Sequence, residues 1–294
     1  MKTVFFLVGD YWHHAETIQP LREILFPKEE YNVIFTEEPQ ELLKMDTAPD
    51  LFISFKDPIE NDQIPTPIWC GDEWTRRFFE FTEDGMGILL VHAAVTDLEA
   101  DHPIARKLID GIFTGHPEAC PVTFKPLGKH PIIDDVKEFT FPENDEHYQM
   151  TVFGSKDTVI IAETRSQNGV QPAMWVKQTD KYRVCCVTPG HTKSNLVCGE
   201  YVKVLRNAVK WCCEYRNNCN NSCAGRSNIT KILGAMRYII PDHSVYASAL
   251  HGSAPVADTP RSSAVHRQAH ELSCPPDYTL YSFQCAFAES RNRR

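Results

Sequence analysis

The sequence contains no hydrophobic run long enough to cross a membrane and no excess of positive charge. Its 294 residues include 39 acidic and 30 basic side chains, which gives a formal net charge of −9 at pH 7. The acidic residues are scattered along the chain rather than gathered in blocks. A surface of this kind repels nucleic acid and anionic lipid, so we expect neither a nucleic acid nor a membrane as a partner.

The start of the chain also lacks the pattern of a secretory signal peptide. Its apolar run, Val4 to Val8, stops at Gly9 and Asp10 and is followed by no small-residue cleavage site. We therefore expect this run to be a buried first strand. The expected location of the protein is the cytoplasm.

The chain has eleven cysteines but no CxxC motif and no paired spacing of a zinc ribbon. Cys185 and Cys186 are neighbours on a predicted strand, so their side chains face opposite sides of the sheet and cannot easily pair. We expect reduced thiols that serve as small hydrophobic residues.

Strands and helices alternate over the first third of the chain. This alternation predicts an α/β fold with a parallel, doubly wound sheet. Apolar, β-rich runs predict the strands, and apolar residues at helical spacing predict the helices. The expected strands are 3–8, 31–35, 50–55 and 88–91, and the expected helices are 16–26, 39–45 and 72–81.

Beyond residue 120 the pattern changes to a strand-rich insert that reaches residue 187, with a helix over 199–215 closing the domain. The expected strands of the insert are 121–124, 138–141, 158–163, 173–177 and 182–187, the last two joined by a hairpin turn. From residue 217 sustained periodicity is lost, apart from a weak helical pattern over 229–240. We expect an α/β domain over 1–216 and an irregular, low-order C-terminal tail over 217–294.

Polar residues able to do chemistry follow several of the predicted strands. Ligands of a doubly wound sheet bind beyond the carboxyl ends of its strands, so these residues define the expected site. His13 and His14 follow the first strand, and His92 follows the fourth. His191 follows the last strand, and the insert adds a segment that contains Glu146.

Each of these residues also has an ordinary explanation. The adjacent His13 and His14 can be solvated loop residues, and His92 or His191 can be a core or turn histidine bonded to a carbonyl. The pair Asp145 and Glu146 can be a solvated acidic patch. The arrival of four separate segments at one predicted sheet edge favours a functional site.

Six spaced blocks of the chain appear in the order seen in ThuA-like (trehalose utilisation) proteins. The sequence over about residues 2–215 therefore resembles this family, a relative of the class I glutamine amidotransferases, and the tail falls outside the resemblance. The blocks are Gly9 to His14, Gly87 to Ala94, His102 to Ile112, Asn144 to Gln149, Pro172 to Trp175, and Tyr182 to His191.

The resemblance implies a flavodoxin-like, amidotransferase-like fold, in which a cysteine nucleophile normally occupies the sharp turn after a central strand. This chain carries His92 there, and its nearest cysteines are Cys70 and Cys120, so we expect no cysteine-dependent glutaminase chemistry. His191 is similar in placement to the catalytic histidine of that superfamily. The family's association with trehalose catabolism implies a substrate such as an oxidised, 3-keto disaccharide.

A 3-keto sugar can be cleaved by acid–base chemistry because its ketone acidifies the neighbouring C–H bonds. We expect His92 or His191 as the base, Glu146 as the acid, and His14 or Tyr148 as the donor to the carbonyl oxygen. The expected substrate-binding residues are Tyr11, Trp12, His13, Asp145, Tyr148 and Trp175, whose aromatic members offer flat surfaces for a sugar.

Two alternatives stay open at this stage. The same histidines, with Glu146, can instead hold zinc or a similar divalent ion, although their scattered spacing matches no metal motif and assigns no ligand. A sugar-binding or degenerate protein without turnover is the second alternative. The expected partner is a small-molecule sugar, and the sequence leaves open whether the chain forms a homo-oligomer.

Overall fold

The computed structural model describes residues 1–60 and 67–214. The expected tail over 217–294, with its helical pattern at 229–240, lies outside the described residues. Within the part that the model describes, no helix has the length and apolar character needed to cross a membrane.

The main sheet has nine strands in the order β2-β1-β3-β4-β11-β10-β9-β6-β7. Its first five strands are parallel to one another. Apart from the edge strand β2, which is only partly buried, their residues are mostly apolar and buried because helices cover both faces, as expected for parallel strands. These strands are β1 (Lys2–Leu7), β2 (Tyr31–Thr36), β3 (Leu51–Ser54), β4 (Gly87–Val91) and β11 (Arg183–Val187).

The other half of the sheet is antiparallel, which confirms the expected change of pattern in the insert. The hairpin between β10 and β11 is present, and every further pairing along this half is also antiparallel. Its strands are β6 (Thr123–Pro126), β7 (Phe139–Thr140), β9 (Thr158–Ser166) and β10 (Gly169–Gln178). The small sheet of β5 (Gly111–Gly115) and β8 (Gln149–Val152) was not expected from the sequence.

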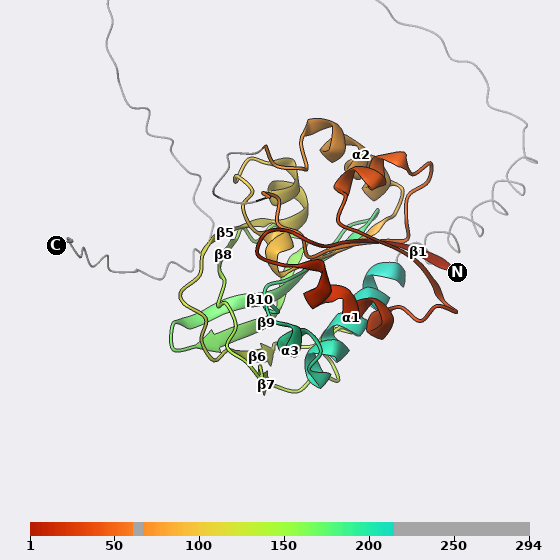
Figure 1. The fold of residues 1–294 in the computed structure, drawn as a ribbon. Helices are drawn as coiled ribbons and strands as arrows, with labels where there is room; N and C mark the ends of the chain where they lie inside the picture. The colour runs from red at the N-terminus through yellow and green to blue at the C-terminus, as the bar shows by residue number, and fades with distance from the viewer. Residues whose placement is uncertain (61–66, 215–294) are drawn as a thin grey trace, which may run out of the picture. The chain divides into compact units, whose positions relative to one another are not determined.

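Helices cover both faces of the parallel half (Figure 1). On one face, Leu21 of α1 (Ala15–Leu25) and Leu205 of the helix over 199–214 belong to a single buried cluster. On the opposite face, Trp74 and Phe78 of α2 (Asp72–Glu83) belong to the second cluster. Cys185 lies in the first cluster and Cys186 in the second, so the adjacent cysteines do face opposite sides.

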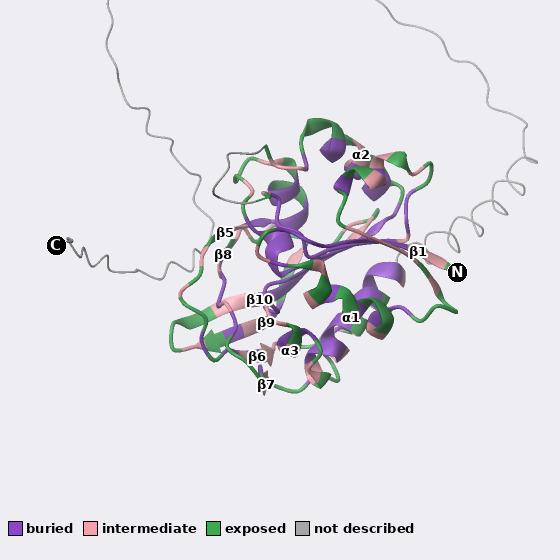
Figure 2. Ribbon diagram, viewed as in Figure 1, coloured by how far each residue is buried: buried purple, intermediate pink, exposed green. Residues whose placement is uncertain are grey.

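Four short helical segments complete the described fold. They are the 3-10 helices η1 (Pro39–Lys44) and η2 (His92–Val95), the π-helical turn η3 (Ala105–Ile109) and α3 (Lys193–Leu196). The strands of the sheet are the most buried part of the fold, whereas the outer sides of the helices are exposed (Figure 2).

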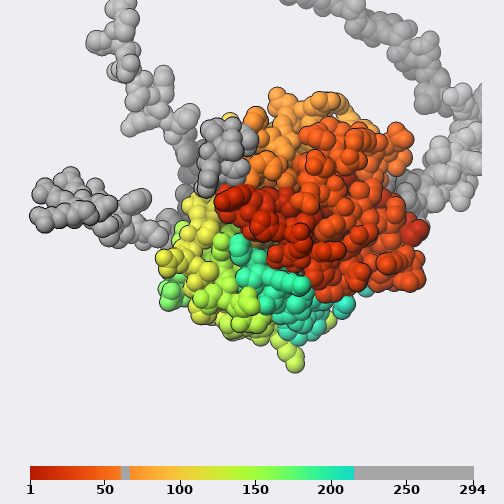
Figure 3. Space-filling model, in the orientation of Figure 1, coloured from red at the N-terminus to blue at the C-terminus, as the bar shows by residue number. Residues whose placement is uncertain are grey.

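The N-terminal and strand-rich parts of the chain form two adjoining areas of one face in the space-filling view (Figure 3, red to orange and yellow to green). The parallel pairing of β1 with β3, β3 with β4, and β4 with β11 brings the carboxyl ends of these strands to one edge. The loops that follow β1, β4 and β11 therefore meet at this edge.

Candidate functional site: a cluster of three histidines and a glutamate

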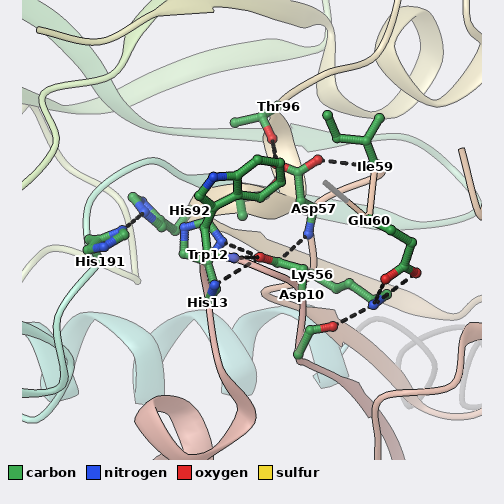
Figure 4. A network of polar contacts seen from close by, with 12 residues as sticks. Asp10, Trp12, His13, Lys56, Asp57, Ile59, Glu60, His92, Thr96 and His191 are labelled. Carbon is green, nitrogen blue, oxygen red and sulfur yellow. Dashed lines mark hydrogen bonds and ion pairs between the residues drawn. The ribbon is translucent and has the colours of Figure 1, made fainter. Parts of the chain in front are cut away.

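Three histidines reach the same point from the carboxyl ends of three parallel strands. His13 comes from the loop between β1 and α1, His92 is the first residue after β4, and His191 follows β11. The ring centre of His13 lies 4.9 Å from that of His92 and 5.0 Å from that of His191. Figure 4 shows these three side chains together, beside Asp10 and Trp12.

His92 occupies the sharp turn that the sequence predicts after β4. Its φ of 53° lies in the left-handed region, which is sparsely populated by residues other than glycine and is common at functional sites. The side chain is buried, and Nδ1 lies 2.8 Å from the carbonyl oxygen of Thr188. Since a carbonyl only accepts, Nδ1–H is the donor, which leaves Nε2 as the ring nitrogen that faces the other side chains of the site.

His13 is oriented by a carboxylate three residues upstream in the same loop. Its Nδ1 lies 2.8 Å from Oδ1 of Asp10, and Asp10 also accepts the backbone N–H groups of Trp12, His13 and Asp57. Burial alone would raise the pKa of Asp10, but these hydrogen bonds and the His13 ring hold it below its usual value.

The other nitrogen of His13, Nε2, is buried and has no hydrogen-bond partner among the described residues. Burial lowers the pKa of His13, although Asp10 opposes the change, so the neutral imidazole is favoured. With Nδ1–H directed at Asp10, the lone pair of Nε2 points away from that carboxylate and into the histidine cluster.

His191 is fixed by a buried carboxylate from the insert. Asp145 is completely buried, and its oxygens accept the backbone N–H groups of Gly190 at 2.8 Å and of His191 at 3.0 Å. Gly190 has a φ of 118°, and a Cβ there would lie 3.0 Å from both Leu196 and Tyr201. Asp145 therefore holds the backbone turn that carries His191, and no part of its side chain faces solvent.

Glu146 brings a carboxylate to the three rings. Its Oε2 lies 3.3 Å from Nε2 of His92 and 3.3 Å from Nδ1 of His191, and these two nitrogens are 3.2 Å apart. With His13 included, the four residues offer ligand atoms that all lie within 4.8 Å of one another. We call these four residues, His13, His92, Glu146 and His191, the His3Glu cluster.

The charges within the cluster are strongly coupled. Burial alone would raise the pKa of Glu146, but the hydrogen bond with His191 and the charge of that ring hold it well below its usual range. The same contact with Glu146 raises the pKa of His191. Glu146 is therefore ionised at neutral pH, and His191 is its favoured proton-bearing neighbour.

Tyr148 packs against the cluster from the side of the small sheet. Its ring stacks on His92 with the centroids 4.4 Å apart, and its hydroxyl lies 3.1 Å from Nε2 of His92. Only 3% of the residue is exposed, and burial raises the pKa of its phenol well above the usual value. Tyr148 therefore keeps its proton and can donate a hydrogen bond into the site.

The structure separates two predicted site residues from the cluster. His14, expected as a catalytic donor, is exposed and sits at the N-terminus of α1. His13, expected as a substrate-binding residue, lies in the cluster instead. Trp175 is 1% exposed and its Nε1–H donates to the carbonyl of Ile109, so its ring is a core residue with no face open to a sugar. Tyr11 is 54% exposed, and Trp12 is partly exposed.

Sequence reasoning assigned no role to three groups that border the cluster. Asp10 orients His13, and the carbonyl of Thr188 orients His92. His116, interpreted from the sequence as a turn residue, places Nε2 3.7 Å from Oε1 of Glu146. The i, i+3 spacing of Asp10 and His13 was a visible signal, whereas the other two contacts depend on tertiary structure.

A second buried carboxyl lies behind Asp10. The backbone N–H of Asp57 donates to Asp10, and its own carboxyl accepts from the Thr96 hydroxyl and from the N–H of Ile59 (Figure 4). Burial raises the pKa of Asp57 to about 8, so this carboxyl is largely protonated at neutral pH.

A cavity of about 370 Å³ adjoins the loop after β1. Asp10, which orients His13, and Tyr11 are among its lining residues, whereas the four cluster residues are not, and most of its other lining residues are polar. Those residues are Gly9, Glu37, Glu38, Pro39, Lys56 and Glu60. The cavity suits a ligand rich in hydroxyl groups, because carboxylates accept hydrogen bonds from them.

Comparison with known proteins identifies the family. The family model for ThuA, described as trehalose utilisation, matches residues 3–212. A search of curated protein sequences finds no match. The match to the family model covers well over half of the chain and includes all four residues of the His3Glu cluster.

Solved structures agree on the fold. A ThuA-like protein from Bacteroides uniformis superposes with a TM-score of 0.57 at 19% identity, covering 72% of this chain and 90% of that protein. A ThuA-like protein from Parabacteroides merdae gives a TM-score of 0.56 at 16% identity over the same shares. With its fold and its family match in agreement, the chain belongs to the ThuA family.

Proposed function

We propose that this protein is an enzyme of sugar catabolism that cleaves a 3-keto disaccharide derived from trehalose or a related sugar. The observation that carries the proposal is the His3Glu cluster, in which basic nitrogens and an ionised carboxylate converge at the carboxyl edge of the sheet. Membership of a family named for trehalose utilisation supports the substrate class. The same membership and the strand order of the parallel half support a flavodoxin-like, amidotransferase-related fold.

The reaction has three chemical requirements. A base removes the proton from C2, next to the ketone at C3, and the developing enolate oxygen needs a positively polarised partner. The C1–O bond then breaks, its electron pair passes to the glycosidic oxygen, and an acid protonates that oxygen. Glucose is thereby released from 3-keto trehalose, and water can later add to the unsaturated product.

The cluster and its neighbours can meet these requirements. The lowered pKa of His13 favours a neutral ring with a free lone pair, and the raised pKa of His191 favours a proton on that ring beside Glu146. Tyr148 can donate to a carbonyl oxygen. The imidazoles can either move protons themselves or hold a cation that polarises the ketone, and only the second arrangement is sensitive to chelators.

The surroundings also suit a disaccharide. The cavity next to Asp10 offers polar lining for a second sugar ring, and the exposed ring of Tyr11 borders it. Pockets of a few hundred Å³ are of the size that binds small ligands. Seven cysteines of the described residues are free, which supports action in a reducing compartment such as the cytoplasm.

The test is glucose release from 3-keto trehalose and related 3-keto disaccharides by the full chain. We expect turnover that falls about 100-fold or more in His13→Gln, because acid–base residues contribute about 10²–10⁴-fold. The adjacent His14→Gln is the matched control and should keep activity within about twofold, since it removes an exposed side chain.

Binding of these sugars without glucose release by folded protein would overturn the proposal and indicate a sugar-binding protein. Equal losses in the two histidine variants would show that the cluster is not the active site.

A further inference from the structure

We propose that the His3Glu cluster is a binding site for a first-row divalent metal ion such as zinc, with His13, His92, Glu146 and His191 as its ligands. The inference deepens the proposed function and rests on the same site, but metal binding can be measured independently of turnover. Of the two arrangements described above, proton transfer by the imidazoles themselves and a bound cation that polarises the ketone, the proposal selects the second.

The first argument is the spacing of the ligand atoms. Nε2 of His92, Nδ1 of His191 and Oε2 of Glu146 form a triangle with sides of 3.2, 3.3 and 3.3 Å. Zinc bonds of about 2.0–2.1 Å in a tetrahedron separate the ligand atoms by about 3.3–3.4 Å. The triangle thus matches one face of such a tetrahedron, and His13 is available as the fourth ligand.

The second argument is the direction of the lone pairs. His92 and His13 use their Nδ1–H groups on Thr188 and Asp10, so both rings present the lone pair of Nε2. Glu146 adds a carboxylate group whose Oε2 lies 3.3 Å from both His92 and His191. The Tyr148 hydroxyl faces Nε2 of His92 and the His191 ring faces Glu146, whereas the lone pair of His13 has no donor among the described residues. A buried lone pair of this kind, beside a carboxylate, favours a cation.

The third argument is the free Nε2 of His13. It is a buried nitrogen without a hydrogen-bond partner among the described residues, which is costly in a folded protein. The residue is 8% exposed, and its ring lies against those of His92 and His191. A metal bond would satisfy this nitrogen without any change in the fixed Nδ1 contact to Asp10.

The groups behind the ligands are those that metal sites use. Ligating histidines usually donate their other N–H to a carboxylate or a backbone carbonyl, which fixes the ring and its tautomer. Asp10 does this for His13, and the carbonyl of Thr188 does it for His92. Asp145 holds the backbone on which His191 stands.

The donor set also selects the class of ion. Three imidazoles and one carboxylate suit zinc and its first-row neighbours, whereas calcium and magnesium prefer sites made of oxygen alone. Glu146 and His191 are the partly exposed members, with 18% and 32% of their side chains accessible, so the ion can enter from their side. The ion would supply the positive charge that polarises the ketone of the substrate.

The test is a titration of the chelator-treated full chain with Co²⁺, followed by metal analysis after buffer exchange and by visible absorption. We expect one retained ion per chain and absorption bands typical of four or five ligands. His13→Ala and Glu146→Ala should lose about 100-fold or more in affinity, and Asp10→Asn should lose about 10–100-fold as a residue that orients a ligand. The exposed His14→Ala is the matched control and should bind as the parent does.

No retained ion, or binding that these variants leave unchanged, would overturn the proposal. Far-ultraviolet circular dichroism of each variant separates loss of the site from loss of the fold. Turnover of 3-keto sugars without a bound ion would overturn the metal site alone. A bound ion in a protein that turns over no 3-keto sugar would support the metal site and overturn the proposed substrate.

Discussion

The two halves of the sheet contribute to the site in different ways. The parallel half supplies all three histidines of the cluster, each from the carboxyl end of a buried strand. The insert that leads into β8 supplies Glu146 and Tyr148 from an irregular segment. The parallel half thus builds a rigid set of nitrogens, and the insert completes it with a carboxylate and a phenol.

The difference shows where the precision of the site comes from. The backbone hydrogen bonds between neighbouring parallel strands fix the positions of the histidines, since β1 pairs with β3, β3 with β4, and β4 with β11. The segment that carries Glu146 has no such ladder, and Asp145 joins it to the turn of His191 by two hydrogen bonds. The two hydrogen bonds of Asp145 are therefore the contact between the two halves whose loss should disturb the site most.

The largest effect is expected from breaking that connection. Asp145→Ala would leave the N–H groups of Gly190 and His191 without their buried acceptor, so the free energy of unfolding should fall by about 3–5 kcal/mol. Urea denaturation measures the change. Exposed Glu118→Ala, from the same part of the chain, is the control and should change stability by less than about 0.5 kcal/mol. A loss of similar size in both variants would show that Asp145 does not join the two halves.

The contrast between the halves also explains how much of the fold the sequence predicts. In the parallel half, continuous apolar runs and helical spacing predict β1 to β4, α1 and α2 to within one or two residues at each end. In the insert, β5 and β8 escape prediction because they are short and mostly only partly buried, and their pairing joins residues about 40 positions apart. Local pattern carries no information about such a pairing.

The same limit applies to the site. Topology predicts that His92 and His191 lie at one edge, because strand ends of a parallel sheet share an edge. Glu146 comes from the insert before β8, to which this rule does not apply, so its contact with them depends on tertiary structure. The choice of His13 over His14 depends on where α1 begins, which periodicity fixes only to a few residues. The burial of Trp175 depends on packing against η3, which no sequence motif predicts.

The next largest effect is expected on the pH dependence of stability, through Asp57 in the loop after β3 of the parallel half. The pKa of Asp57 is raised to about 8 in the fold, so the folded protein binds a proton that the unfolded chain releases near pH 4. This contribution to stability is complete below pH 4 and is lost as the pH rises through 8.

Asp57→Asn removes that titration. The stability of the variant relative to the parent should therefore increase by about 4 kcal/mol between pH 5 and pH 8.5, since about three units of pKa difference act over this range and one unit corresponds to about 1.4 kcal/mol. Thermal unfolding at both pH values measures the difference. A difference that does not change with pH would show that Asp57 is already ionised in the fold.

The smallest effect concerns the antiparallel half. Trp175→Phe removes the hydrogen bond to Ile109 and part of a buried ring, so we expect a loss of stability of about 1–2 kcal/mol. The KM for a 3-keto disaccharide should stay within about twofold, because the ring is buried away from any sugar. A large rise in KM without loss of stability would restore Trp175 as a sugar-stacking residue.

The central claim is that side chains from the two halves act as one site. A double-mutant cycle tests it most directly, with kcat/KM for 3-keto trehalose measured in His13→Ala, Glu146→Ala and the double variant. Residues that act as a unit are not additive, so the double variant should lose about as much as the worse single variant. Losses that multiply in the double variant would contradict the account, because the two residues would then act independently.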